Sequence, residues 1–149
     1  MNMTMTADKN ALRREAKRHR ERMDVQLEDP DIACQIFFDK IKPQQGQIVS
    51  AYWPIGREID TTPIIERLID EKIDFALPLV VKGKRELKFA LWDGAVPLIR
   101  GEYDVYEPNQ NESTQYVDPD IMIVPLLAFD RRGHRMGYGG GHFDTTIAA

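Results

Sequence analysis

The 149-residue sequence contains a single cysteine, Cys34, so no disulfide can form within the chain and no cysteine cluster is available for zinc. No apolar run approaches the roughly 20 residues that a membrane-spanning helix requires. The first ten residues, MNMTMTADKN, show no basic segment followed by an apolar stretch, which is the pattern of a secretory signal. From these absences we expect a cytoplasmic protein that does not associate with membranes.

Several common catalytic and nucleotide-binding signatures are also missing. No Ser-His-Asp or Cys-His arrangement can be read from the sequence, so no covalent protein nucleophile is expected. The glycine-rich stretch near residue 140 is not followed by the GK[ST] of a phosphate-binding P-loop. It also carries His142 where the dinucleotide fingerprint GxGxxG has its last glycine.

Positive charge is concentrated in one segment of an acidic chain. The net charge is −4, yet residues 9–22 hold seven Lys and Arg against two Glu, a local charge of +5 that leaves −9 elsewhere. Such a segment indicates an anionic partner. Nucleic-acid binders usually spread basic residues over a face with interleaved aromatics, which this segment lacks, so a phosphate-bearing small molecule is favoured over nucleic acid.

The apolar pattern predicts a single α/β domain spanning residues 1–149. We expect a helix over 8–23 with Asp8 as N-cap, a second from Pro30 to before Pro43, and a third over 62–72. Strands are expected at 48–55, 74–81, 86–93 and 120–129. The buried positions are predicted to be Ile32, Ile36, Phe37 and Ile41 in the second helix and Ile64, Ile65, Leu68 and Ile69 in the third.

These elements predict a three-layer architecture with a mostly parallel sheet. The first two strands and the helix between them form a βαβ unit. The turn KGKR then leads into an antiparallel strand. Cys34, Tyr52 and Trp53 are the types of residue that usually fill a core.

The most informative segment is DRRGHRMGYGGGHFD, residues 130–144. Its glycines lie between a buried strand and the expected start of a short helix, where open α/β sheets bind ligands. Glycine lets a phosphate approach the backbone closely, although glycines also serve tight turns in loops that bind nothing.

Two charged residues favour the phosphate interpretation. Arg135 can donate two hydrogen bonds to phosphate oxygens, and Asp144 can hold Mg²⁺ through one carboxylate. The alternative for Asp144 is stabilisation of the helix dipole. If they bind no phosphate, Lys9 and Arg13, one turn apart, belong to a solvated helix face. Glu58 is likewise of a type that usually lies on the surface.

The run VPLLAFDRRGHRMGYGGGHFD resembles the signature of the 5-formyltetrahydrofolate cyclo-ligase family, approximately P-x-x-x-F-D-x-x-G-x-R-L-G-x-G-x-G-[YH]-[YF]-D. The segment YWPIGREIDTTPI and the Lys9/Arg13 pair are also similar to family segments and occur in the same order. Two departures are Met136 for Leu and His142-Phe143 for Tyr-Tyr; the latter removes phenol hydroxyls, which a hydrogen bond from His142 could replace.

The resemblance implies a set of site residues. Arg135 and Tyr138 would be catalytic, and Asp144 would bind magnesium. The ATP-binding residues would be Lys9, Arg13, Arg135, Met136, Gly137, Tyr138, Gly139, Gly140, Gly141, His142 and Phe143. The residues that bind the folate would be Trp53, Glu58, Tyr138, Gly139, Gly140, Gly141 and His142.

The resemblance further implies a NagB/RpiA/CoA-transferase-like fold and the ATP- and Mg²⁺-dependent conversion of 5-formyltetrahydrofolate, polyglutamylated or not, to 5,10-methenyltetrahydrofolate with release of ADP and phosphate. The alternatives are a binding module for folate, nucleotide or RNA without catalysis, and a sugar-phosphate enzyme of the same fold class. Family members usually continue past the motif, so we expect this chain to lack the family's C-terminal segment and to be a monomer or to associate through an uncovered strand edge.

Overall fold

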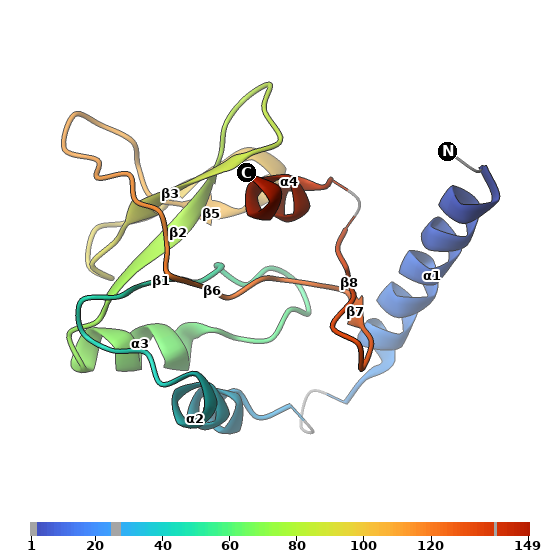
Figure 1. Ribbon diagram of the computed structural model, residues 1–149, viewed down its shortest axis with the longest axis horizontal. Helices are drawn as coiled ribbons and strands as arrows, with labels where there is room; N and C mark the ends of the chain where they lie inside the picture. The colour runs from blue at the N-terminus through green and yellow to red at the C-terminus, as the bar shows by residue number, and fades with distance from the viewer. Residues whose placement is uncertain (1–2, 25–27, 139) are drawn as a thin grey trace. The chain divides into compact units, whose positions relative to one another are not determined.

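The computed structural model describes residues 3–24, 28–138 and 140–149, and this part of the chain forms two compact units (Figure 1). Unit 1 combines residues 1–28 with 125–141, and unit 2 combines 29–124 with 142–149. Each unit is described by itself. The expectation of one domain over residues 1–149 stays a prediction.

Unit 2 contains most of the secondary structure. Its helices are α2 (Pro30–Ile41), α3 (Thr62–Asp70), the short 3₁₀ helix η2 (Glu102–Asp104) and α4 (His142–Ala148). Its strands are β1 (Ile48–Ser50), β2 (Asp74–Val80), β3 (Leu87–Leu91), β4 (Ile99–Arg100), β5 (Tyr106–Glu107) and β6 (Ile121–Met122).

The central sheet of unit 2 has the strand order β3-β2-β1-β6. Strand β1 pairs in parallel with both β2 and β6, whereas β2 and β3 are antiparallel. The predicted βαβ unit, β1-α3-β2, is therefore confirmed, as is the antiparallel strand after the KGKR turn. The result is a mixed α/β sheet that is mostly parallel.

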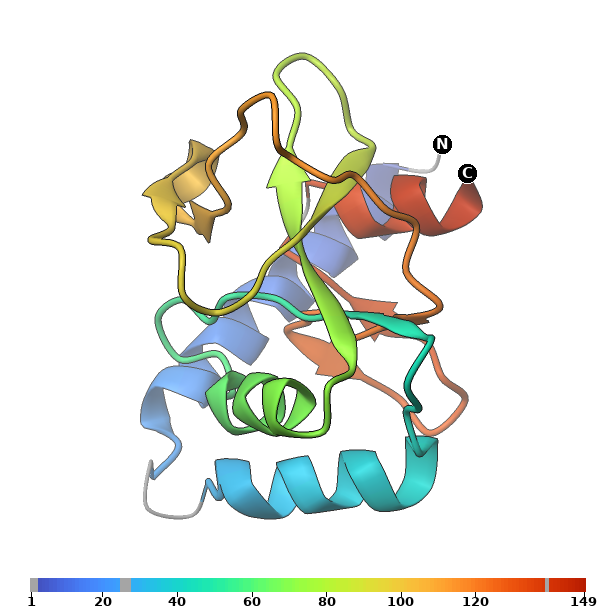
Figure 2. The ribbon, with the colours of Figure 1, turned by 90° about the vertical axis from the view of Figure 1, so that its left-hand side faces the viewer.

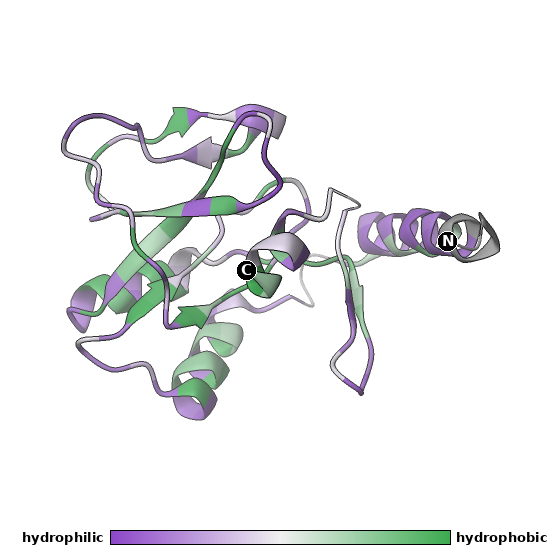
Figure 3. Ribbon diagram, turned by 45° about the horizontal axis from the view of Figure 1, so that its top comes forward, coloured by the Kyte–Doolittle hydropathy of each residue, from purple (hydrophilic) through white to green (hydrophobic). Residues whose placement is uncertain are grey.

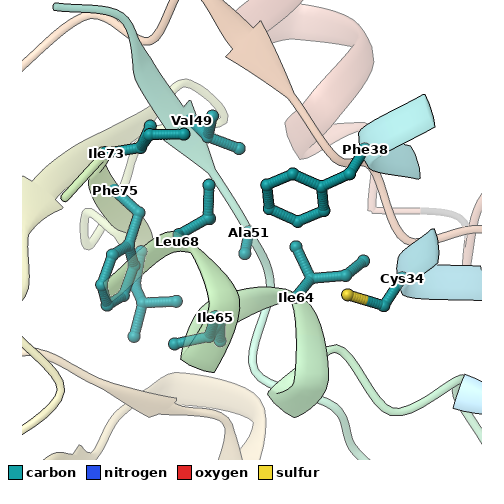
Figure 4. Close-up of a cluster of buried hydrophobic side chains, with 10 residues drawn as sticks. Cys34, Phe38, Val49, Ala51, Ile64, Ile65, Leu68, Ile73 and Phe75 are labelled. Atoms are coloured by element: carbon teal, nitrogen blue, oxygen red, sulfur yellow. The ribbon is translucent and has the colours of Figure 1, made fainter. Parts of the chain in front are cut away.

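One face of this sheet packs against α2 and α3, which lie next to one another in Figure 2. Figure 4 shows the resulting core, in which side chains from β1 and β2 meet those of the two helices. Its fully buried members include Val49, Leu68 and Leu77, each with no exposed surface. Burying a side chain of this size stabilises the fold by about 1.5–3 kcal/mol.

The opposite face of the sheet carries a smaller apolar cluster. Ala76, Leu87 and Phe89 form its buried part, and Phe143 of α4 packs against them. Because successive residues of a strand point to opposite faces, Phe75 and Ala76 belong to different clusters. Helices therefore lie against both faces of the sheet.

Helix α2 begins as predicted but buries a different face. Oδ1 of Asp29 accepts hydrogen bonds from the backbone N–H groups of Asp31 and Ile32, at 3.0 and 3.1 Å, which caps the helix. The prediction that Ile32, Ile36 and Ile41 are buried is wrong, because they are 53%, 54% and 51% exposed.

The buried side chains of α2 are instead Cys34 and Phe38, and the partly buried Phe37 packs beside them. Two residues along a helix turn the side chain by about 200°, so Cys34 lies nearly opposite Ile32. The guanidinium of Arg67 from α3 lies 4.1 Å from the centre of the Phe38 ring, which adds a cation–π contact to the packing of this face. Burial of Cys34 is confirmed.

Helix α3 buries Ile64, Ile65 and Leu68 as predicted. The prediction for Ile69 is wrong, because this side chain is 42% exposed. The helix also ends at Asp70 rather than at residue 72, where Lys72 adopts a left-handed backbone conformation with φ of 58°.

The predicted strands 48–55 and 120–129 are both too long. The first pairs only as β1, although Ala51 and Tyr52 beyond it are buried. The second is split into β6 in unit 2 and β7 in unit 1. In the central sheet, pairing ends at Ser50 in the first run and at Met122 in the second, so the apolar character of each run extends beyond its paired residues.

Unit 1 consists of α1 (Met3–Arg22) and a hairpin of β7 (Ala128–Phe129) and β8 (Arg135–Met136). Asp8 is not the N-cap, because the helix begins five residues earlier and Asp8 lies inside it. Figure 3 shows α1 as hydrophilic along most of its described length. Two apolar residues of the predicted helix over 8–23, Leu12 and Met23, are 53% and 41% exposed. No helix in the described ranges is long and apolar enough to cross a bilayer.

Candidate active site

The hairpin of unit 1 is shaped by the FDRRG sequence. Oδ1 of Asp130 accepts hydrogen bonds from the backbone N–H groups of Arg132 and His134, at 2.9 and 3.0 Å. The His134 ring bonds to Oδ2 of the same carboxylate at 3.0 Å, and this bond, together with the backbone donors, lowers the pKa of Asp130. Gly133 has φ of 86°, a left-handed conformation that favours glycine. The motif thus forms the turn between β7 and β8.

The basic helix α1 contacts the segment that follows the hairpin. Nε of Arg13 donates a hydrogen bond of 3.1 Å to the carbonyl oxygen of Gly137. One of its Nη atoms bonds to Oδ1 of Asn10 at 3.0 Å. Lys9 is exposed one turn before Arg13 on the same helix. The structure therefore brings Arg13 to the start of the glycine-rich segment.

Within the described residues, nothing in the structure requires position 137 to be glycine. A Cβ added there would meet no atom within 4 Å, and its φ lies outside the left-handed region. Gly141 also has open space beside it, but its φ of 71° accounts for the glycine. Gly140 is exposed, and Gly139, predicted to bind ATP and folate, lies outside the described residues. Neither packing nor backbone strain thus accounts for Gly137.

The remaining predicted residues of unit 1 lie at β8 and just after it. Arg135 and Met136 form β8 and are half-buried, and the carbonyl oxygen of Met136 accepts a hydrogen bond of 2.7 Å from the N–H of Leu127. Tyr138 is 42% exposed. Its hydroxyl accepts a 2.6 Å hydrogen bond from Arg20 of α1.

In unit 2, helix α4 begins at His142. Nδ1 of His142 lies 3.0 Å from the carbonyl oxygen of Arg85. A carbonyl can only accept, so Nδ1 carries the proton and, in the neutral ring, Nε2 is an acceptor. The ring also contacts Tyr103, with centres 5.8 Å apart. His142 therefore donates its Nδ1–H to the backbone carbonyl of Arg85.

Phe143 and Asp144 follow in the first turn of α4. Phe143 packs into the apolar cluster on the sheet, so its ring anchors the helix. Asp144 is exposed, in the first turn as predicted. Among the described residues no group of three or more His, Cys, Asp or Glu forms a ready-made metal site. A single accessible carboxylate still fits Mg²⁺, which keeps most of its waters and is shared with phosphates.

Trp53 and Glu58, predicted to bind the folate, lie on the loop after β1. The half-buried Trp53 packs against the main core and meets Trp92 edge-to-face, with ring centres 5.7 Å apart. Oε1 of Glu58 accepts a hydrogen bond of 2.9 Å from the N–H of Ile55, which shapes the loop. Tyr52 is buried, as predicted for a core residue.

The predicted site residues thus belong to both units. Unit 1 holds those that the resemblance assigns to ATP phosphates, together with Tyr138 and the described glycines. Unit 2 holds Trp53, Glu58, His142, Phe143 and Asp144. The chain passes from one set to the other at the peptide bond between residues 141 and 142.

The sequence pattern did not single out two residues that the structure shows in notable positions, Arg20 and Glu107. Arg20 contacts Tyr138. Because Arg20 lies seven residues, or two helical turns, after Arg13, the spacing could have placed these two arginines on one face of the helix. Glu107 is a buried carboxyl, 8% exposed, to which the N–H of Val80 donates at 3.4 Å. Burial raises its pKa, against the lowering effect of that hydrogen bond, and the nearby charge of Glu102 raises it further. Glu107 lies in a segment without clear periodicity, so the sequence carried no signal for its burial.

A family model described as the 5-formyltetrahydrofolate cyclo-ligase family matches residues 5–149. The chain belongs to this family. It is 31% identical over 112 residues to the 5-formyltetrahydrofolate cyclo-ligase of Haemophilus influenzae, covering 72% of this chain and 59% of that protein. It is also 31% identical over 104 residues to the protein of the same name from Escherichia coli K12, covering 66% of this chain and 56% of that protein. The chain thus spans less than two thirds of these relatives, which are named as ligases.

Two solved structures have the same fold as this cyclo-ligase family chain. The 5,10-methenyltetrahydrofolate synthetase of Aquifex aeolicus matches 94% of this chain and 72% of its own, with a TM-score of 0.71 and 22% identity. The synthetase of the same name from Mycoplasma pneumoniae matches 95% of this chain and 77% of its own, with a TM-score of 0.68 and 21% identity.

Proposed function

We propose that this family member catalyses the ATP- and Mg²⁺-dependent conversion of 5-formyltetrahydrofolate to 5,10-methenyltetrahydrofolate, with release of ADP and phosphate. The observation that supports nucleotide binding is the environment of Gly137. Its carbonyl is held by Arg13, and the space where a side chain would project is open, which suits the close approach of a phosphate. Family membership carries the choice of reaction.

On the nucleotide side, we assign Lys9, Arg13 and Arg135 to the phosphates, because fixed cations offset the charge of a transferring phosphoryl group. The segment from Met136 to Phe143 supplies backbone groups along the nucleotide. Asp144 would hold Mg²⁺, which neutralises phosphate charge when it is bound.

On the folate side, Trp53 and Glu58 would orient the pterin, with contacts from the segment 138–142. The substrate could carry one glutamate or a polyglutamate tail. We also propose that the α/β unit follows the NagB/RpiA/CoA-transferase-like architecture, and that the protein acts in the cytoplasm.

The proposed reaction suits a site without a protein nucleophile. The formyl oxygen attacks the γ-phosphate and displaces ADP; N10 then attacks the activated formyl carbon, and phosphate leaves as the ring closes. Arg135 and Tyr138 would act on the phosphoryl group during the first step. The protein positions the reactants and balances charge, which is how most phosphoryl-transfer enzymes accelerate their reactions.

The test is an absorbance assay for the methenyl product, with purified protein, 5-formyltetrahydrofolate, ATP and Mg²⁺. Product formation that requires both ATP and Mg²⁺ is the expected result. Binding of folate or ATP without turnover would indicate the binding-module alternative, and turnover of a sugar phosphate without ATP the other enzyme class. Salt-sensitive binding of RNA by residues 9–22 would also favour the module.

A further inference from the structure

Arg20 makes a two-pronged contact within unit 1. One Nη atom donates a hydrogen bond of 2.6 Å to the hydroxyl of Tyr138, and the other bonds to the carbonyl oxygen of Leu126. The guanidinium carbon also lies 5.9 Å from the centre of the Tyr138 ring. A hydrogen bond from a charged donor is stronger than a neutral one, so this contact holds its partners firmly.

The two acceptors lie on opposite sides of the hairpin base. Leu126 lies just before β7, and Tyr138 lies just after β8. Between them, the N–H of Leu127 bonds to the carbonyl oxygen of Met136. Arg20 therefore joins the segment that enters the hairpin to the segment that leaves it, and ties both to α1.

Arg20 differs from Lys9, which is exposed on the same helix, because both Nη atoms of Arg20 are engaged with protein acceptors. Arg13 engages Nε and one Nη atom with protein acceptors in a similar way. Tyr138 directly follows Gly137, the first glycine of the glycine-rich segment, so the position of Tyr138 also constrains that glycine. Arg13 holds the neighbouring carbonyl of Gly137. Two arginines two turns apart on α1 thus fix consecutive residues of the segment.

We propose that Arg20 is a positioning residue that clamps the base of the hairpin and fixes Tyr138, so that Tyr138 and the neighbouring Gly137 are held ready for the phosphates of ATP. The clamp itself stands on the geometry of unit 1, and its effect on ATP rests on the proposed function. Arg20 acts through Tyr138 and Leu126 and does not bind phosphate.

The clamp can be tested without catalysis by brief digestion of the folded protein with trypsin. Cleavage after Arg131, Arg132 and Arg135 is followed by mass spectrometry in the wild type, Arg20→Ala, Arg20→Lys, Tyr138→Phe and the double variant R20A/Y138F. Arg14→Ala, an exposed change of equal charge on the same helix, is the control. We expect cleavage of the hairpin to accelerate about tenfold in Arg20→Ala, the effect of losing one charged hydrogen bond.

The other variants separate the clamp from a general loss of stability. Lys can reach only one of the two acceptors, so Arg20→Lys should fall between the wild type and Arg20→Ala. The double variant should be cleaved no faster than Arg20→Ala if the two residues act as one unit. Equal cleavage in Arg20→Ala and Arg14→Ala, or additive effects in the double variant, would overturn the clamp.

The consequence for ATP is tested by steady-state kinetics. Arg20→Ala should raise the KM for ATP about tenfold, because the positions of Gly137 and Tyr138 are no longer fixed, and should lower kcat less than Arg135→Ala does, because Arg135 itself remains. A faster-cleaved hairpin with an unchanged KM for ATP would overturn the positioning role. If the wild type shows no turnover, the proposed function fails, and calorimetric titration with ATP and Mg²⁺ then measures the same shift as a change in Kd.

Discussion

Nε of Arg13 donates a hydrogen bond to the carbonyl oxygen of Gly137, a residue 124 positions later in the chain. The contact joins the basic N-terminal helix to the segment that carries the family signature. Over residues 8–22 the helix is mostly hydrophilic, and the side chains of Arg13 and Arg20 bond to backbone carbonyls of this segment. Both parts contain residues that we assign to the proposed phosphate site.

Gly137→Ala should weaken ATP binding without unfolding the protein. The added methyl group meets no described atom within 4 Å, and the φ of Gly137 lies outside the left-handed region, so the free energy of unfolding should change by less than about 0.5 kcal/mol. The methyl group would instead occupy the space proposed for a phosphate, and calorimetry should show at least a roughly tenfold higher Kd for ATP. Gly133→Ala is the contrasting variant, because φ of 86° should cost an alanine about 1–2 kcal/mol of stability. An unaltered affinity for ATP in Gly137→Ala would contradict a phosphate site beside this residue.

Arg135→Ala should lower kcat by on the order of 10² if the guanidinium acts on the transferring phosphoryl group. Arg131→Ala, an exposed change in the hairpin turn, is a matched control and should have little effect. Both are compared by steady-state kinetics at saturating ATP and folate. An unchanged kcat in Arg135→Ala would leave this residue with a purely structural role in β8.

Asp144→Asn should raise the concentration of Mg²⁺ that gives half-maximal activity, because the amide is a poorer ligand than the carboxylate. Folate binding, followed by fluorescence titration, should stay the same. The variant retains the shape of the side chain in the first turn of α4. If the Mg²⁺ dependence does not move, Asp144 returns to the helix-dipole role.

Glu107→Gln should alter how stability depends on pH. Burial raises the pKa of Glu107, so the folded protein holds the proton more tightly than the unfolded chain. The associated stability is fully present below the ordinary pKa of 4.5 and is lost as pH rises through the higher folded value. Thermal unfolding should therefore show the stability of Glu107→Gln rising relative to the wild type as the pH increases from 4.5, whereas the exposed control Glu86→Gln should show no such rise. Parallel curves for wild type and Glu107→Gln would contradict the raised pKa.

Phe38→Ala and Ile36→Ala test which face of α2 is buried. Phe38 is 7% exposed, so its truncation should cost about 3–5 kcal/mol of unfolding free energy. Ile36 is 54% exposed, and its truncation should cost about 0.5 kcal/mol or less. Denaturant unfolding gives both values. The reverse order would restore the face predicted from the sequence.

The sequence by itself determined those features whose cause is local. Asp29 and Pro30 start α2 because the carboxylate caps the first N–H groups and proline suits the first helical position. The βαβ unit follows from two apolar runs separated by a helical pattern. The signature around residues 125–144 is likewise local, and it identified the family.

Only the tertiary structure decided the features that depend on distant partners. Helical periodicity alone does not distinguish a buried face with Ile32 and Ile36 from one with Cys34 and Phe38. Packing against α3 and the sheet determines which of the two faces is buried. The run 120–129 reads as one strand, yet it divides between two units because β6 finds a partner in β1 and β7 finds one in β8. In the sequence, Arg20 resembles the other cations of its helix. Its partners Tyr138 and Leu126 lie more than a hundred residues later in the chain, and only the fold brings them into contact with it. Hydrogen bonds and burial are satisfied by whichever groups the whole fold brings together, and spacing along the chain does not contain that information.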